Sequence, residues 1–172
     1  MRQISRLLAA AAAFLIAAGT ASAGTLEDLI SEYRCPLIEK LEKTHMAYRA
    51  VAGRDRFLSV SVPEHPHGYV QCLFHDGNRQ LHCEAASGYF SAQQYRLPAD
   101  RVAALGRLGF ATGVSDANYG IDFDMPLNPD FDRLARLLLT ALHDGYGARA
   151  ATRLRINAPF VPSAAPACAP VS

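Results

Sequence analysis

The sequence predicts one α+β domain of two layers, in which helices pack on one face of an antiparallel sheet. Apolar residues recur at helical spacing in three segments and alternate along four others. Three of the alternating segments follow one another with no helix between them, which favours an antiparallel sheet over a Rossmann-like parallel one. The length of 172 residues allows one core. The expected order is helix, three strands, helix, strand, helix, with room for a short last strand.

The first 23 residues have the features of a secretory signal peptide. Arg2 and Arg6 precede an apolar run over residues 7–18, which leads into Ala21-Ser22-Ala23. This run is too short to span a bilayer as a helix, and no later segment reaches about 18 apolar residues. We therefore expect cleavage before Gly24, a mature chain with no membrane anchor, and a periplasmic or secreted location.

The mature chain is expected to form a single domain over residues 24–157, followed by a disordered Ala- and Pro-rich tail at 158–172. Its first helix starts after the cap residue Thr25 and continues to Tyr48, with a kink or a restart before Pro36. Gly53 is expected to end this helix. The first strand is predicted at 57–62.

Two alternating runs, at 69–74 and 80–86, flank Asp76-Gly77-Asn78 and predict a β-hairpin. If the loop is centred on residues 77 and 78, Cys72 lies opposite Cys83 on the buried face. Their Cα atoms would be about 5.5 Å apart with a two-residue loop and about 4.5 Å apart with a four-residue loop, and both distances allow a disulfide. A loop centred one residue earlier would place Cys72 opposite Leu81 instead.

Export would put all four cysteines in an oxidising compartment. Four cysteines allow three connectivities. The hairpin register favours the pair Cys72–Cys83, and the connectivity we rank first joins Cys35 to Cys168 as the second bridge.

The second half of the domain supplies two more helices and a strand. A helix opens at Leu97-Pro98-Ala99-Asp100, and Gly109 is suited to end it. The run at 119–125 is a strand with one apolar face. Asn128-Pro129-Asp130 begins the clearest amphipathic helix, which ends at Gly147 and should pack on the sheet. Residues 153–156 could form the last strand.

Composition and motifs argue against several functional classes. The 17 basic and 16 acidic side chains form no long run of one sign, so nucleic-acid binding is not expected. We find no serine elbow, paired-carboxylate cleft or Gly-rich phosphate loop, and we assign no catalytic residue and no cofactor. Cys35 and His45 are about 15 Å apart along a helix, too far for a nucleophile and its base.

Two clusters resemble metal sites only loosely. His65, His67, His75 and His82 lie near two cysteines, but no pair has the i, i+4 spacing of a helical site and the cysteines face the core. The aspartates at 122, 124, 130 and 132 lack the glycine and the distal glutamate of a calcium loop. We therefore assign no metal ligand.

The outward face of the hairpin is the candidate contact surface. The favoured register sets Gln71 opposite Glu84 and Leu73 opposite His82, and Tyr69 shares this face. A solvated sheet face has little need of a tyrosine and a leucine. These five residues are the expected peptide-binding set, either by strand addition at a sheet edge or by docking across the face. An ordinary half-polar face, or one covered by another element, remains the alternative.

The chain resembles the YbjN-type, type III secretion chaperone-like (TY-Chap) domain over about residues 57–156. The resemblance rests on Tyr69-Val70-Gln71, Glu84, the segment Leu105-Gly106-Arg107-Leu108-Gly109-Phe110, Leu142, Tyr146-Gly147 and Leu154. Phe110 stands where similar sequences often have Trp, and the signal peptide and the four cysteines are not part of the pattern. The resemblance implies a non-enzymatic domain that binds a peptide or protein segment.

The sequence as a whole therefore predicts an exported, non-enzymatic domain that binds a protein or peptide partner, with no nucleic acid and no cofactor. Two alternatives stay open. One is a small extracytoplasmic enzyme or metal-binding protein that uses the histidine-rich hairpin. The other is a structural homo-oligomer, such as a homodimer, whose exposed sheet face is its own contact surface.

Overall fold

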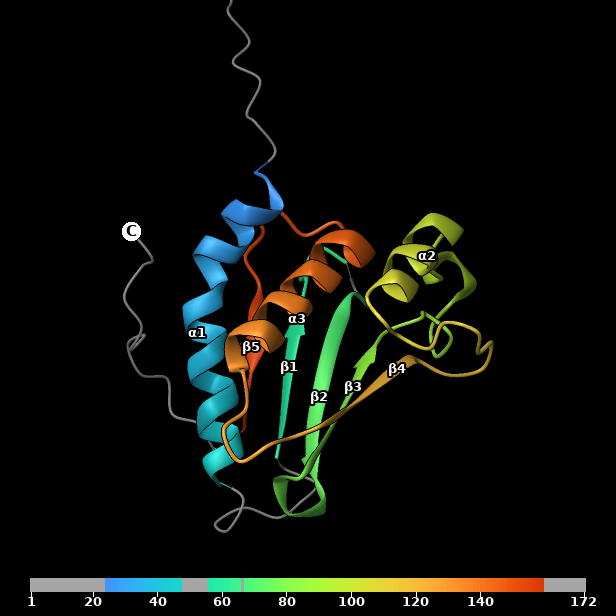
Figure 1. Cartoon of the computed structure of the whole chain (residues 1–172). Helices are drawn as coiled ribbons and strands as arrows, with labels where there is room; N and C mark the ends of the chain where they lie inside the picture. Colours follow the sequence, from blue (N-terminus) through green and yellow to red (C-terminus); the bar gives the residue numbers. More distant parts are fainter. Residues whose placement is uncertain (1–23, 48–55, 66, 160–172) are drawn as a thin grey trace, which may run out of the picture.

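The computed structural model describes residues 24–47, 56–65 and 67–159, which form the α+β fold that the sequence predicts (Figure 1). The short last strand is present. In chain order the elements are α1 (Leu26–Met46), β1 (Phe57–Ser61), β2 (Tyr69–His75), η3 (Asp76–Asn78), β3 (Gln80–Ala85), η4 (Gln93–Tyr95), α2 (Ala99–Arg107), β4 (Tyr119–Asp124), α3 (Phe131–Tyr146) and β5 (Arg155–Asn157).

The five strands form one antiparallel sheet in the order β4-β3-β2-β1-β5. Helices α1 and α3 lie side by side on one face, and β4 runs at the edge of the sheet far from α1 (Figure 1). Buried and half-buried residues alternate along β1, β2 and β3. This alternation gives the sheet one face against the helices and one face that no described helix covers.

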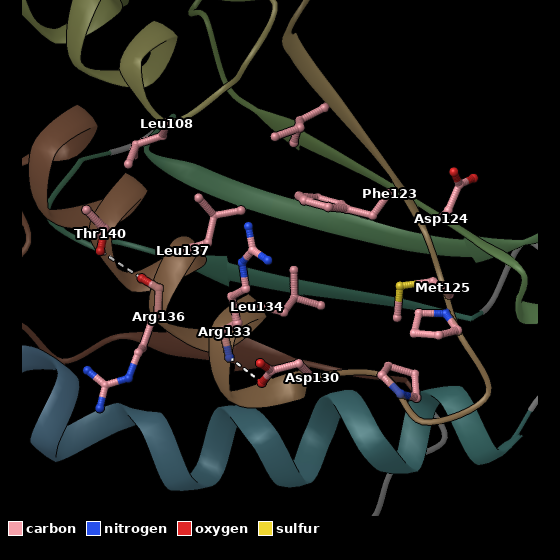
Figure 2. Close-up of a pocket in the computed structure, with 13 residues that line it drawn as sticks. Leu108, Phe123, Asp124, Met125, Asp130, Arg133, Leu134, Arg136, Leu137 and Thr140 are labelled. Atoms are coloured by element: carbon pink, nitrogen blue, oxygen red, sulfur yellow. Dashed lines mark hydrogen bonds between the residues drawn. The ribbon is translucent and has the colours of Figure 1, made fainter.

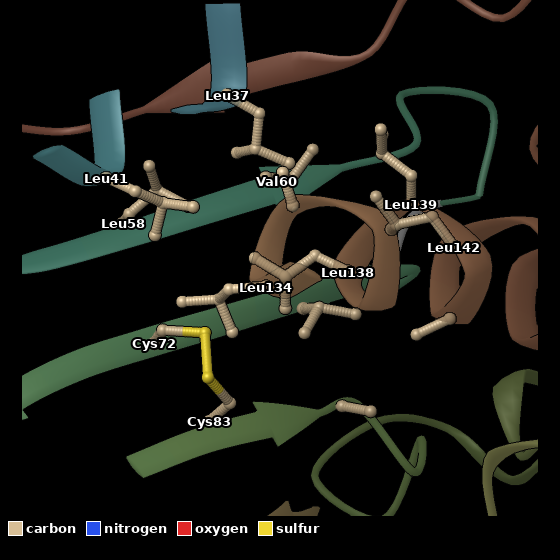
Figure 3. Packing of buried hydrophobic residues seen from close by; sticks show 14 of the residues in the cluster. Leu37, Leu41, Leu58, Val60, Cys72, Cys83, Leu134, Leu138, Leu139 and Leu142 are labelled. Atoms are coloured by element: carbon tan, nitrogen blue, oxygen red, sulfur yellow. A yellow bond between two sulfur atoms is a disulfide. The ribbon is translucent and has the colours of Figure 1, made fainter. Parts of the chain in front are cut away.

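The core lies between this sheet and the two helices (Figure 3). Leu37 and Leu41 of α1 meet Leu58 and Val60 of β1, and Leu138 of α3 is fully buried beside them. Burying an aliphatic side chain of this size contributes about 1.5 to 3 kcal/mol relative to leaving it exposed. The apolar stripes of α1 and α3 therefore hold the two layers together.

Helix α1 is continuous through Pro36, so the predicted restart does not occur. Thr25 and Asp28 form a full capping box at its start, which satisfies backbone donors that the first turn would leave unpaired. The helix is assigned from Leu26 to Met46. Tyr48, Gly53 and most of the predicted tail lie outside the described residues.

The hairpin has the four-residue loop, one of the two alternatives for a loop centred on residues 77 and 78. His75 pairs with Gln80, and Cys72 pairs with Cys83. The Cα atoms of the two cysteines are 4.0 Å apart, nearer to the spacing expected for the four-residue loop than to that for the two-residue loop. A disulfide joins them inside the core (Figure 3).

Backbone conformation explains the loop. Asp76, Gly77 and Asn78 all have positive φ angles, of 47°, 62° and 67°, and Gly, Asn and Asp are the residues that tolerate this region best. The Asn78 side chain is buried, where it donates to the His45 carbonyl and accepts from Arg56. The loop is thereby attached to the end of α1 and the start of β1.

Cys35 is disulfide-bonded as well. Its predicted partner, Cys168, lies outside the described residues, so that pairing stays a prediction. Among the helices of residues 24–47, 56–65 and 67–159, none is both long and apolar enough to cross a membrane.

Candidate functional site

The outward face of the hairpin carries the predicted contact residues in two rows across the sheet. Gln71 pairs with Glu84, and the Gln71 amide donates to the Glu84 carboxylate at 3.0 Å. Leu73 pairs with His82 in the next row. These four residues surround a shallow hollow of about 280 Å³, which Phe57 of β1 completes. The structure therefore brings together four of the five residues.

Tyr69 is placed differently from the other four. It belongs to the same face by register, but it does not line the hollow. Its hydroxyl accepts a hydrogen bond from the Asn118 amide at 3.0 Å, and its ring packs against the core. The Asn118 carbonyl oxygen in turn accepts from the Ser87 backbone. Tyr69 thus also holds the end of the hairpin against the segment that precedes β4.

His82 links the hairpin to the edge strand. Its Nδ1 lies 2.7 Å from the Asp122 carboxylate, and its Nε2 lies 3.6 Å from Glu84. A Cβ on Gly120 would approach the His82 ring to 3.0 Å, so the glycine leaves space for the imidazole on β4. Much of the polar surface on this face is therefore already engaged within the sheet.

A second and larger cavity lies on the helical side of β4, where the sequence analysis assigned no site (Figure 2). It measures about 570 Å³, within the range of small-molecule pockets. The apolar lining comes from the end of α2, from β4 and the residues after it, and from α3, namely Leu108, Ile121, Phe123, Met125, Pro126, Pro129, Leu134 and Leu137. We call this cavity the β4–α3 groove.

The groove exists because the two long helices do not reach the edge of the sheet. Helix α3 packs on α1, α2 and β2, which leaves Ile121 and Phe123 of β4 only half buried. Figure 2 shows Phe123 over the groove and Asp124 on the other side of the strand. The alternation of β4 predicted the apolar face, but no local pattern indicates that α3 stops short of it.

The wall that α3 contributes to the groove is basic. Arg136 pairs with Asp132 at 3.3 Å and with Glu27 at 3.9 Å. Arg133 is exposed, and its guanidinium forms no ion pair with any residue of the described ranges. Asp130 also lines the groove, but its carboxylate accepts from the Arg133 backbone N–H as the N-cap of α3.

The remaining candidate residues are dispersed. Within the described part of the chain, no three His, Cys, Asp or Glu side chains gather as a metal site. The ring of His65 packs on Tyr146, and that of His67 packs on Tyr95. The four aspartates of the calcium-like set separate: Asp122 contacts His82, Asp124 accepts from Gln80, Asp130 caps α3, and Asp132 pairs with Arg34 and Arg136.

Several residues that carry the family resemblance have structural roles. The Tyr146 hydroxyl is buried and donates to the Ala86 carbonyl at 2.7 Å, which fixes α3 to the end of β3. Gly147 has a φ of 76° and ends α3, as expected, and Gly109 has a φ of 98° just after α2. The resemblance thus rests largely on residues that determine the fold.

Comparison with known proteins gives one result. Residues 38–160, more than half of the chain, match the family model described as TY-Chap3, T3SS (YopN, CesT) and YbjN peptide-binding chaperone 3. No curated protein and no solved structure matches. The match covers every strand of the sheet, helices α2 and α3, and the second half of α1. The chain therefore belongs to this family of peptide-binding chaperone domains.

Proposed function

We propose that this protein is an exported chaperone-like domain that binds an extended segment of a partner protein and catalyses no reaction. The observation that carries the proposal is the β4–α3 groove, an apolar cavity beside a sheet edge in a member of a peptide-binding chaperone family. Apolar pockets beside a strand edge suit extended chains, because the backbone can pair while alternate side chains enter the pocket.

Export is supported by two independent features. Residues 1–23 have the pattern of a signal peptide, and a disulfide joins Cys72 to Cys83, a bond that persists mainly in oxidising compartments. Fractionation of native cells tests this part of the proposal. The protein should be found in the envelope or medium with Gly24 as its first residue, whereas a cytoplasmic chain beginning at Met1 would contradict export.

Binding is tested with the oxidised chain of residues 24–172 and a fluorescent polypeptide that is reduced, alkylated and permanently unfolded. Leu137→Gln changes a half-buried groove residue, while Leu127→Gln is the matched control, since Leu127 is 98% exposed and does not line the groove. Because about half of a leucine side chain is removed from apolar contact, the variant should lose about 1 kcal/mol of binding free energy. Anisotropy should show about fivefold weaker binding for the first variant and no change for the second.

Equal affinities for the two leucine variants would contradict a role for the groove. The outward hairpin face would then be the remaining candidate, with the five residues named above. Sedimentation of the unliganded protein is needed in parallel, because a concentration-dependent mass would favour the alternative in which this face is a homodimer contact.

A further inference from the structure

The outer edge of β4 carries backbone groups that nothing in the described part of the chain pairs with. The Met125 N–H donates to the Arg79 carbonyl at 2.7 Å, next to the pairs that join β4 to β3. By the alternation of antiparallel ladders, residues 119, 121 and 123 then direct their backbone groups toward β3, and residues 120, 122 and 124 direct theirs outward. Among the described residues, only Gly120 has a partner there, because its carbonyl accepts from the Ala111 N–H at 2.7 Å. Asp122 and Asp124 therefore form an open edge.

The two sides of this edge differ in chemistry. On the helical side, an added strand would place alternate side chains over the β4–α3 groove, against Ile121 and Phe123 and close to the basic wall of α3. On the opposite side, its other side chains would lie next to the carboxylates of Asp122 and Asp124. The Asp122 side chain is 74% exposed. Apolar residues suit the first side, where the guanidinium of Arg133 opposes further positive charge, and basic residues suit the second.

We propose that the β4 edge binds an extended partner segment in which apolar and basic residues alternate. This inference rests on the proposed function. The apolar side chains enter the groove, and the basic side chains face Asp122 and Asp124. A second copy of this chain is a poorer occupant. Pairing β4 with itself about Asp122 sets two like charges opposite each other, and pairing about Phe123 sets Asp122 opposite Asp124, both of which are unfavourable. The carboxylates thus also protect the edge from self-association.

The probes are blocked synthetic hexapeptides of alternating Lys and Val, of alternating Glu and Val, and of Lys and Val in two blocks. Each is titrated into the oxidised chain of residues 24–172. The alternating Lys–Val peptide should bind about tenfold or more tightly than either control, because the two carboxylates attract one charge pattern and repel the other. Its advantage should shrink as ionic strength rises. Equal binding of the three peptides would overturn the proposal.

Two pairs of substitutions test whether Asp122 and Asp124 cause the preference for the Lys–Val peptide. Asp122→Asn with Asp124→Asn should remove most of the preference for Lys–Val over Glu–Val. Glu64→Gln with Asp100→Asn is the matched control, since it changes the net charge equally at two exposed positions outside β4. The control should retain the full preference. A preference that survives in the first pair, or that disappears equally in both pairs, would contradict the assignment to β4.

Backbone pairing is tested with two N-methylated forms of the Lys–Val peptide, one methylated at each Lys and the other at each Val. They have the same composition, but only one set of amides can face β4 in a given strand direction. Methylation of one set should abolish binding, and methylation of the other should leave it nearly unchanged. Equal effects of the two sets would overturn strand addition.

Binding of the reduced and alkylated polypeptide distinguishes a failure of this proposal from a failure of the proposed function. If the chain binds that polypeptide but not the Lys–Val peptide, the assignment of the partner chemistry is wrong and the proposed function stands. If it binds neither, both fail. A concentration-dependent dimer that the Lys–Val peptide does not dissociate would show that a second copy occupies the surface and would also overturn the proposal.

Discussion

Reducing the Cys72–Cys83 disulfide should lower the free energy of unfolding by about 3 kcal/mol. The bridge closes a hairpin with a sequence separation of 11 residues, and the loss of chain entropy in the unfolded state for a loop of that length gives this value at 25 °C. The two side chains are buried, with at most 1% exposure. Reduction therefore leaves two thiols in an apolar site that accepts them, and the folded state should persist.

The assay is urea unfolding of one protein in its oxidised and reduced forms. Cys35→Ala with Cys168→Ala provides the background, so that only the hairpin bridge responds to the reductant. The far-UV spectrum of the reduced protein should match that of the oxidised one before the transition. A difference below about 1 kcal/mol would refute the chain-entropy reasoning. Loss of the native spectrum on reduction would show that the bridge is required for folding.

Three further predictions concern single features of the fold. Burial against Phe74 and Phe131, together with the charge of Arg56, lowers the pKa of His45. The folded-state pKa is thus below that of the unfolded chain, so the contribution of neutral His45 to the free energy of unfolding should be fully present above about pH 6.5 and be lost as the pH falls below that value. In urea titrations at several pH values, His45→Gln should reduce the pH dependence of the free energy of unfolding, and an unchanged pH dependence would contradict this prediction. Asn78→Ala should cost about 2 kcal/mol, because it leaves the buried Arg56 unpaired, and a cost below about 0.5 kcal/mol would show that the loop does not need this contact. Tyr69→Ala with Glu84→Ala should lower the free energy of unfolding by about 1 to 3 kcal/mol, because the Tyr69 ring packs against the core and its hydroxyl accepts from Asn118. The folded double variant should still bind the unfolded polypeptide, since neither residue lines the β4–α3 groove; loss of binding without loss of stability would instead place the contact on the outward hairpin face.

The sequence predicts the fold well where local patterns determine it. Alternation located β1 to β4, and the caps at Thr25 and Asp130 located the starts of α1 and α3. The choice between the two loop lengths could not be made in this way. It depends on Asn78, whose side chain binds the end of α1, 33 residues earlier in the chain.

The site was harder to predict, for the same reason. The register of β2 and β3 follows from the hairpin, so the residues around the hollow on the outward face could be named in advance. The β4–α3 groove depends on how far α3 extends across the sheet, which tertiary packing determines. The apolar face of Ile121 and Phe123 was visible in the sequence, but its incomplete coverage was not.

The most direct test of the account is amide hydrogen exchange with and without the alternating Lys–Val peptide. The N–H groups of Asp122 and Asp124 point away from β3, and they should exchange rapidly in the free protein and slowly in the complex. The amides of Ile121 and Phe123, already paired with β3, should change little and serve as internal references. No protection at Asp122 and Asp124 under saturating peptide would contradict binding at the edge of the sheet.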